Sequence, residues 1–241
     1  MSAGPPEGGR GAPLLVELVG RAGAGKSTLQ RTLLERYRDL EPMPLLRKRP
    51  YTWVLARHTL RALATLARRR AVDFQRPVDQ IRMMAYLGAL PEVFAAGDGR
   101  RVVLVDQGPI YSLTRPNLVD PRLADWWEAA FATWRERLDL VVWLDAPDEV
   151  LLERIQSRPK FHRLQGRERE DALAFLANTR AVYESTLTRL GEHEPGPAVL
   201  QVDTGRLSAD EAAERIRARI DALVGADGGA ADGRRAPAAS A

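Results

Sequence analysis

The amino-acid sequence predicts a single α/β domain in which helices cover both faces of a parallel sheet. Short runs rich in valine and leucine alternate along the chain with longer stretches of helical periodicity. Three of the four clearest runs have no polar alternation, which is typical of strands buried on both faces. A glycine-rich segment, residues 20–27, links the first run to the first helical stretch. Because ligands bind at the carboxyl ends of the strands in such sheets, we expect the functional site there.

The predicted strands are the apolar runs themselves. The four clear runs are 14–19, 102–106, 140–145 and 199–202, and a weaker fifth candidate is 45–49. The stretches predicted to be helices are 27–40, 53–67, 78–96, 123–137, 147–158, 168–190 and 208–224. Pro147 suits a first helical position, and Ser208 followed by Glu211 forms a capping box at the start of the last helix.

The two ends of the chain differ in composition from its centre. Residues 1–12 are rich in glycine and proline, and residues 225–241 are mostly small or polar. Such segments cannot bury enough area to offset their ordering entropy, so we expect both to be disordered tails. The folded domain is therefore predicted to span residues 13–224.

The composition excludes several classes of protein. Of the 241 residues, 45% are hydrophobic and 28% are charged, which is ordinary for a soluble globular domain. There is no apolar run of about 18 residues and no signal-peptide pattern, so we expect neither a transmembrane segment nor secretion. The absence of cysteine excludes disulfides, iron–sulfur clusters, thiolate zinc sites and cysteine nucleophiles. The simplest location is the cytoplasm.

Positive charge is concentrated in one segment. The net charge is only +4, yet residues 44–76 hold nine basic residues and one acidic residue. The whole protein is therefore not expected to bind nucleic acid, although this segment is locally positive.

The helix in this segment has apolar residues at spacings of three and four, namely Trp53, Ala56, Leu60, Leu63 and Ala67, and this side is expected to pack in the core. The arginines at 57, 61 and 68 line the opposite, polar face. Three interpretations stay open. The basic helix 51–70 steers an anionic substrate, contacts an acidic partner or membrane surface, or is simply solvated.

The segment after the first predicted strand reads Gly20-Arg21-Ala22-Gly23-Ala24-Gly25-Lys26-Ser27, followed by Thr28 in the helix. This is the G-x-x-x-x-G-K-S pattern in the strand–loop–helix context of a phosphate-binding loop. Its glycines let backbone amides converge on phosphate oxygens, and the helix N-terminus adds partial positive charge. We expect residues 20–28 to bind ATP, with Lys26 on the β- and γ-phosphates and Ser27 on Mg²⁺.

The rest of the sequence narrows the class of nucleotide-binding protein. The guanine-recognition pattern N/T-K-x-D is absent, which argues against a GTPase. Asp106 at the end of a predicted strand is followed by Gln107, not by the glutamate of a dedicated hydrolase. The remaining class transfers the γ-phosphoryl group to a small-molecule acceptor.

Several motifs resemble those of one kinase group. They are Asp106 at a strand end, the run 140–158, the pattern Phe175-x3-Thr179-Arg180-x2-Tyr183, and Asp203-Thr204-Gly205 after the last strand. These motifs resemble the thymidylate kinase and deoxynucleoside kinase group of P-loop kinases. The resemblance implies a three-layer P-loop NTPase fold, a five-stranded parallel sheet of order 2-3-1-4-5, a helical lid at about 158–167, and ATP with Mg²⁺ as cofactors. One difference is that the group has Asp-Arg or Glu-Arg where this chain has Asp106-Gln107.

The candidate site residues follow from the loop and the resemblance. The expected catalytic residues are Lys26, Asp106, Arg158 and Arg163. Asp106 is expected to orient or deprotonate the acceptor, or to help Ser27 hold Mg²⁺. The lid cations Arg154, Arg158, Lys160, His162 and Arg163 are expected to close over the triphosphate, and Arg154 and Asp203 are expected to contact the nucleotide.

The acceptor is expected to be a nucleoside or nucleotide. A kinase of the same fold for a non-nucleoside metabolite stays open because of Gln107. A nucleotide-dependent switch or accessory ATPase that uses the basic helix for a partner also stays open, as does a homodimer.

Overall fold

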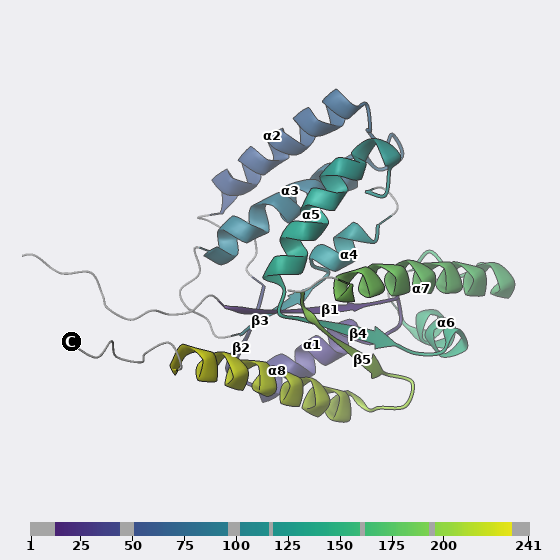
Figure 1. Ribbon diagram of the computed structural model, residues 1–241. Helices are drawn as coiled ribbons and strands as arrows, with labels where there is room; N and C mark the ends of the chain where they lie inside the picture. The colour runs from purple at the N-terminus through teal and green to yellow at the C-terminus, as the bar shows by residue number, and fades with distance from the viewer. Residues whose placement is uncertain are drawn as a thin grey trace, which may run out of the picture.

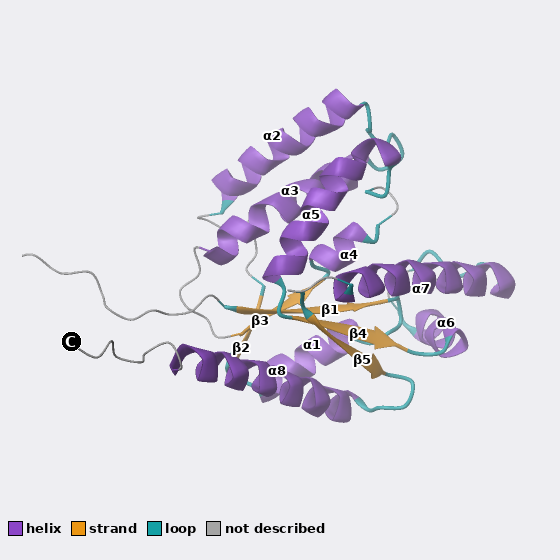
Figure 2. Ribbon diagram, viewed as in Figure 1, coloured by secondary structure: helices purple, strands orange, loops and turns teal. Residues whose placement is uncertain are grey.

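The protein is described by a computed structural model that covers residues 13–43, 51–95, 102–115, 118–159, 162–192 and 196–232. It contains a five-stranded parallel sheet of order β2-β3-β1-β4-β5 with helices on both faces (Figures 1 and 2). The strands are β1 (Leu14–Gly20), β2 (Leu40–Pro42), β3 (Val102–Asp106), β4 (Leu140–Asp145) and β5 (Ala198–Asp203). The predicted α/β class and the sheet order implied by the resemblance are confirmed.

The centre of the sheet positions the site. Every residue of β1 is buried, because β3 and β4 flank this strand and helices cover both of its faces. Leu18 in β1 pairs with Asp106 in β3, so β3 ends two residues short of Gly20. The loop that follows β1 therefore begins beside the tip of β3.

The second strand differs from the prediction. β2 is Leu40–Pro42 and pairs with β3 through Leu40 and Val102, whereas the predicted strand 45–49 lies outside the described residues. The helix predicted over 27–40 is α1 (Lys26–Arg36), and it ends early because Tyr37 adopts extended backbone angles. A three-residue strand that contains proline is too short to show a periodic pattern.

The helices form two layers around the sheet. On one face, α1 lies beside α8 (Ala209–Asp232), and α6 (Asp148–Ser157) packs into the same core. On the other face lie α2 (Thr52–Arg69), α3 (Pro77–Ala95), α4 (Pro109–Leu113) and α5 (Ala124–Arg137), as Figure 1 shows. The helix α7 (Arg169–Gly191) contributes buried residues to both cores. The 3₁₀ turn Pro121–Leu123 and α4 are shorter than the periodicity that predicts helices.

The last helix starts with a capping box and is longer than predicted. The Glu211 carboxylate accepts from the Ser208 backbone N–H at 2.9 Å, and the Glu211 N–H donates to the Ser208 hydroxyl at 3.2 Å. This is the predicted capping box. The helix continues to Asp232, beyond the predicted domain end at residue 224. Residues 1–12 and 233–241 lie outside the described residues.

The helix α2 is oriented differently from the prediction. Its buried residues are Ala62 and Leu66, which face α3, whereas Trp53, Leu60 and Leu63 are exposed. The apolar side predicted to pack in the core therefore faces outward, because α2 has apolar residues on two sides and the spacing alone does not say which is buried. None of the described helices is long and apolar enough to cross a membrane.

A buried carboxyl group holds the segment that follows β3. Glu17 lies in β1, and its two oxygens accept from the backbone N–H groups of Ile110 at 2.9 Å and Tyr111 at 3.0 Å. These are donors in the first turn of α4, which have no partner within the helix. A Cβ added at Gly108 would lie 2.9 Å from the Glu17 carboxyl carbon, so only glycine allows this approach. Burial raises the pKa of Glu17 to about 8.

This pKa predicts a specific pH dependence of stability. Between the ordinary pKa of 4.5 and about 8, folded Glu17 keeps a proton that the unfolded chain has lost. Raising the pH through this window should therefore lower the free energy of unfolding, by at most about 1.4 kcal/mol per pH unit from this group. Glu17→Gln keeps the shape of the protonated form and should remove that slope. Urea unfolding of both proteins from pH 5 to 9 measures it, and parallel pH profiles would contradict the assignment.

Candidate active site

The glycine-rich loop makes close contacts that only glycine permits. At Gly20 an added Cβ would lie 2.4 Å from the Leu144 carbonyl oxygen, and at Gly23 it would lie 2.8 Å from the Leu151 carbonyl oxygen. Gly23 and Gly25 have φ near +84° and +82°, which favours glycine. Gly25 is the N-cap of α1, so the helix starts at Lys26 with its first backbone N–H groups directed at the loop. Ala24 is fully buried beneath the loop.

The side chain of Arg21 points away from the loop into the protein. It is fully buried, and it donates to the Asp145 carboxylate at 2.7 Å, to the Ala146 carbonyl at 2.8 Å and to the Leu176 carbonyl at 3.1 Å. It also donates to the Asp148 carboxylate. Arg21 was predicted to bind the nucleotide as part of the loop, and its side chain ties that loop to β4, α6 and α7. Only the Arg21 backbone is part of the loop.

Asp145 completes this network at the end of β4. Its second oxygen accepts from Arg180 of α7 at 2.5 Å, and Asp145 is itself buried. Two buried or half-buried guanidinium groups therefore share one carboxylate. The contacts support a structural role for Asp145 and Arg180.

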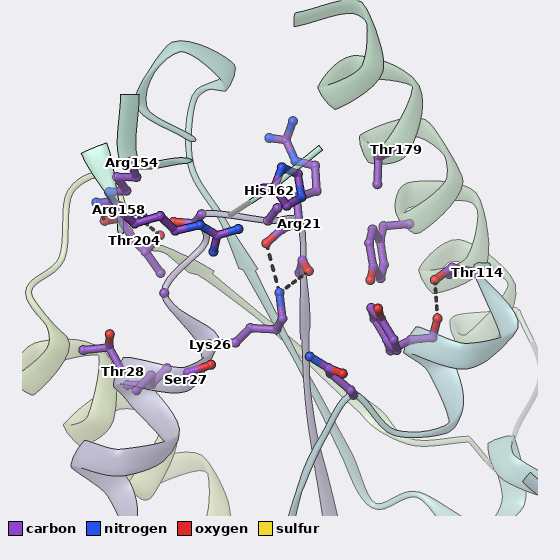
Figure 3. A pocket seen from close by; sticks show the side chains of 18 of the residues that line it. Arg21, Lys26, Ser27, Thr28, Thr114, Arg154, Arg158, His162, Thr179 and Thr204 are labelled. Atoms are coloured by element: carbon purple, nitrogen blue, oxygen red, sulfur yellow. Dashed lines mark hydrogen bonds between the residues drawn. The ribbon is translucent and has the colours of Figure 1, made fainter. Parts of the chain in front are cut away.

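Lys26 is the one lysine in the described ranges, and it lies at the centre of the site in Figure 3. Its ammonium group donates to the carbonyl oxygens of Gly20 at 2.5 Å and Arg21 at 2.9 Å. Burial lowers the pKa of Lys26 to about 8, while the charge of Asp106 raises it and that of Arg158 lowers it. The ammonium group is thus held at the loop with one acid and one further cation nearby.

Asp106 at the tip of β3 has an oxygen that makes no hydrogen bond. Its Oδ1 is buried without a partner among the described residues, and burial raises its pKa while Lys26 opposes the shift. Ser27 is exposed at the start of α1. An unpaired carboxylate oxygen and a serine hydroxyl are both oxygen ligands of the kind that Mg²⁺ prefers. Asp106 does not itself line the cavity, whereas its neighbour Gln107 does.

A cavity of about 910 Å³ opens beside the loop. Figure 3 shows the loop with Arg154, Arg158 and Thr204 on one side, Lys26 in the middle, and Thr114 with Thr179 on the far side. We call the first side the loop end and the second the far end. Besides the loop, the lining includes Gln107, Tyr111, Thr114, Arg115, Arg154, Arg158, His162, Arg163, Phe175, Asn178, Thr179, Tyr183 and Thr204.

Arg154 connects the loop to the turn after β5. Its guanidinium donates to the Thr204 carbonyl at 2.7 Å, to the Thr204 hydroxyl at 3.2 Å and to the Gly23 carbonyl at 3.4 Å. It lines the cavity, as does Thr204. Asp203 does not line it; its carboxylate accepts from the Gly205 N–H at 2.8 Å and so shapes the turn.

In the segment predicted as a lid, between α6 and α7, the described residues Arg158, His162 and Arg163 line the cavity. The described residues of this segment form turns and contain no helix, and Lys160 lies outside the described residues. The Gln165 amide donates to the carbonyls of Ile155 at 3.0 Å and Arg158 at 3.1 Å, which fastens the segment to α6. Burial, followed by the charges of Arg158 and Arg163, lowers the pKa of His162.

The far end combines aromatic rings with arginines. The Arg163 guanidinium lies 4.2 Å from the centre of the Phe175 ring, and Arg115 lies 5.7 Å from that of Tyr111. Burial lowers the pKa of Arg163, and the charges of Arg115, Arg76 and Arg167 lower it further. Within the described ranges, no acidic side chain forms an ion pair with Arg115 or Arg163.

Sequence reasoning missed part of the far end. Tyr111, Arg115 and Asn178 line it, and they come from α4, the turn after it, and α7. Phe175, Thr179 and Tyr183 also line the cavity, and they belong to a motif that carries the resemblance. The approach of Tyr111 and Arg115 to α7 depends on the tertiary fold.

The comparisons with known proteins agree with this architecture. No protein-family model matches the chain, and no curated protein matches it. Among solved structures, it is similar to a thymidylate kinase from Candida albicans, with a TM-score of 0.54 and 12% identity over 88% of this chain and 92% of that chain. A deoxyadenosine kinase from M. mycoides, solved with bound dATP, has a TM-score of 0.48 and 17% identity, covering 86% and 100% of the two chains. The chain thus has the fold of the P-loop nucleotide kinases.

The Arg21 network predicts a large and local effect on stability. Arg21→Gln should lower the free energy of unfolding by about 3–5 kcal/mol, because it leaves the Asp145 charge buried and only partly paired. Arg36→Gln is a matched control, since Arg36 pairs with Asp210 and Glu214 on the surface. That change should cost about 1 kcal/mol or less. Urea unfolding measures both free energies, and equal losses would show that the buried network contributes no more to stability than a surface ion pair.

Proposed function

We propose that the protein is an ATP- and Mg²⁺-dependent phosphotransferase that moves the γ-phosphoryl group to a small nucleoside or nucleotide acceptor. The observation that carries the proposal is one cavity with Lys26 between the glycine-rich loop and a far end of aromatic rings and arginines. A phosphate-binding loop alone would serve a switch or a hydrolase. The far end of the same cavity provides room for an acceptor.

The residues at the loop end have separate tasks in this reaction. The loop amides and the N-terminus of α1 bind the phosphates, and Lys26 leaves the carbonyls of Gly20 and Arg21 to contact the transferred group. Ser27 and Asp106 would hold the metal ion, which when bound neutralises charge on the β- and γ-phosphates. Arg158, together with Arg163 of the far end, stabilises the charge that develops on the group in transfer, and the segment over the cavity excludes water.

The transfer step balances without a further reactant. An acceptor oxygen forms a bond to the γ-phosphorus, the bond between that phosphorus and the bridging oxygen breaks, and ADP leaves. A phosphate acceptor attacks as the oxyanion and loses no proton, whereas a hydroxyl acceptor would give its proton to Asp106, whose pKa burial raises.

The far end favours an anionic acceptor with an aromatic ring. Tyr111 and Phe175 offer flat surfaces for a base, and Arg115 and Arg163 bring charge that no described acid neutralises. A guanidinium in such a place fits a phosphate group. Arg115 and Arg163 would thus supply the charge that this chain lacks at Gln107. We therefore expect a nucleoside monophosphate to be a better acceptor than a neutral nucleoside.

A second candidate is the same transfer to an anionic metabolite that is not a nucleotide. Gln107 favours it, because the kinase group has arginine at this position. Both candidates are tested by ADP release with ATP and Mg²⁺ across nucleosides, nucleoside monophosphates, and sugar or amino-sugar phosphates. Release with monophosphates alone supports the proposal. Binding of ATP without release on any acceptor would favour a nucleotide-dependent switch.

Lys26 should be required for transfer but not for folding. Lys26→Met should reduce the rate by about a thousandfold or more, because it removes the cation that stabilises the transferred phosphoryl group. Circular dichroism and thermal unfolding would check that the variant is folded. A folded variant with the wild-type rate would refute the mechanism.

Arg115 should affect the binding of the acceptor but not the binding of ATP. Arg115→Gln should raise KM for a nucleoside monophosphate by about 10- to 100-fold, as expected for a lost charge-assisted hydrogen bond, while KM for ATP changes little. Arg31→Gln on the exposed surface of α1 is the matched control. Steady-state kinetics with each substrate varied separate the two. An equal rise in both constants would place Arg115 outside the acceptor site.

A further inference from the structure

The fold leaves one side of α2 uncovered by any described residue. Ala62 and Leu66 face α3, while Trp53 is 77% exposed and Leu60 is 68% exposed. In Figure 1, α2 is the outermost helix of its layer, with α3 between it and the sheet. At 100° per residue, the exposed apolar residues fall on one stripe, which we call the α2 outer face; they are Trp53, Ala56, Leu60, Leu63, Ala64 and Ala67. An exposed apolar surface of this kind marks an interaction site.

One edge of the α2 outer face is positively charged. Arg57, Arg61 and Arg68 were predicted to lie opposite the apolar residues, but at 100° per residue they fall side by side along this edge. Arg57 pairs with Glu92 of α3, whereas Arg61 and Arg68 have no ion-pair partner among the described residues. α2 contains no acidic residue. Its partner must therefore be apolar where it meets the stripe and anionic where it meets the edge.

The same composition continues beyond the C-terminus of α2. Phe74 and Val78 are strongly exposed, and Arg76 lies between them in the sequence. Residues 44–76 contain nine basic residues and one acidic residue. Exposed apolar side chains mixed with arginines therefore occur both in α2 and in the segment that follows its C-terminus.

A second copy of this chain fits the α2 outer face poorly. In a two-fold antiparallel pair of α2 helices, the edge with Arg61 and Arg68 would face its own copy. Like charges brought together in this way oppose association. A two-fold pairing of α2 with itself would thus repel at the edge while it buries the stripe.

We propose that the α2 outer face binds an anionic lipid surface. Trp53, Leu60 and Leu63 enter the boundary between headgroups and acyl chains, and Arg61 and Arg68 contact lipid phosphates. Tryptophan and leucine beside arginine are the composition of helices that lie in this interface. A single projecting helix can lie along a flat bilayer without a shaped groove in its partner. The proposal is independent of the proposed kinase activity, because no residue of α2 lines the cavity.

The test uses the full chain and vesicles of defined lipids. Co-sedimentation compares vesicles of phosphatidylglycerol and phosphatidylcholine with vesicles of phosphatidylcholine alone. We expect binding to the anionic vesicles only, weakened by at least about 30-fold in R61E/R68E, since each arginine near such a surface adds attraction and each glutamate adds repulsion. R215E/R219E is the matched control, because it makes the same charge change on exposed residues of α8, on the other face of the sheet. The control should bind within about twofold of the wild type.

Insertion of the apolar stripe needs its own measurement. L60S/L63S should lose most of the binding while keeping its thermal unfolding, because both side chains are exposed. Tryptophan emission should shift to the blue on anionic vesicles, and W53F should bind but show little of this shift. The emission is informative because Trp134 and Trp143 are buried and Trp126 and Trp127 are half-buried.

Three results would overturn the proposal. The first is the absence of wild-type binding to the anionic vesicles. The second is equal binding by R61E/R68E and R215E/R219E, which would show that net charge and not this face is responsible. The third is a concentration-dependent dimer in sedimentation that L60S/L63S dissociates, which would assign the face to a second copy. The variants should keep any activity of the cavity, so a failed kinase assay and a failed lipid assay are distinguishable.

Discussion

The cavity depends on the buried ion pair between Arg21 and Asp145. Arg21 occupies a position that the phosphate-loop pattern leaves free, yet its guanidinium joins the loop to the tip of β4, the start of α6 and the middle of α7. Its nitrogen atoms find acceptors on two carboxylates and two carbonyls, which compensates for taking the charge out of water. Because the side chain anchors the loop from below, the backbone amides above it are not used for that purpose. Rigid support for the loop and free donors for a ligand are therefore provided by different atoms of the same segment.

Three titratable groups with shifted pKa values lie near the point where β3 ends and the loop after β1 begins. Glu17 lies beneath the segment after β3, Asp106 lies at its tip, and Lys26 faces Asp106 across the loop. With its pKa raised to about 8, Glu17 is neutral at pH 7 and leaves Asp106 as the acid opposite Lys26. A second negative charge here would repel a polyphosphate. Burial keeps Glu17 protonated although its hydrogen bonds to the Ile110 and Tyr111 N–H groups favour the charged form, so the carboxyl group holds this segment without adding charge to the site.

The parts of the structure that the sequence predicted are those encoded locally. The strands β1, β3 and β4 are almost entirely apolar because both faces of the sheet are covered there, and the capping box at Ser208 is a four-residue signal. The edge strand β5 is a short apolar run that contains Gln201 and has exposed positions. β2 has three residues, one of them proline, and α4 has five, so neither produces a period. The roles of Arg21 and Glu17 depend on partners 124 and 93 residues away, at Asp145 and Ile110. The far end of the cavity is likewise assembled from α4 and α7, which no local pattern brings together.

The orientation of α2 shows what a periodic pattern leaves undetermined. The helix has apolar residues on two sides, and it buries Ala62 and Leu66 against α3 while Trp53 and Leu60 remain in solvent. In the isolated chain, the hydrophobic effect alone would favour burying the side with Trp53 and Leu60, since large apolar side chains gain more free energy from burial than alanine does. The arginine edge explains the arrangement better than packing does. If the outer side packed on α3, Arg61 and Arg68 would be drawn toward an apolar core, where unpaired charge is costly. The helix therefore combines a side that fits the protein with a side whose chemistry fits something outside it.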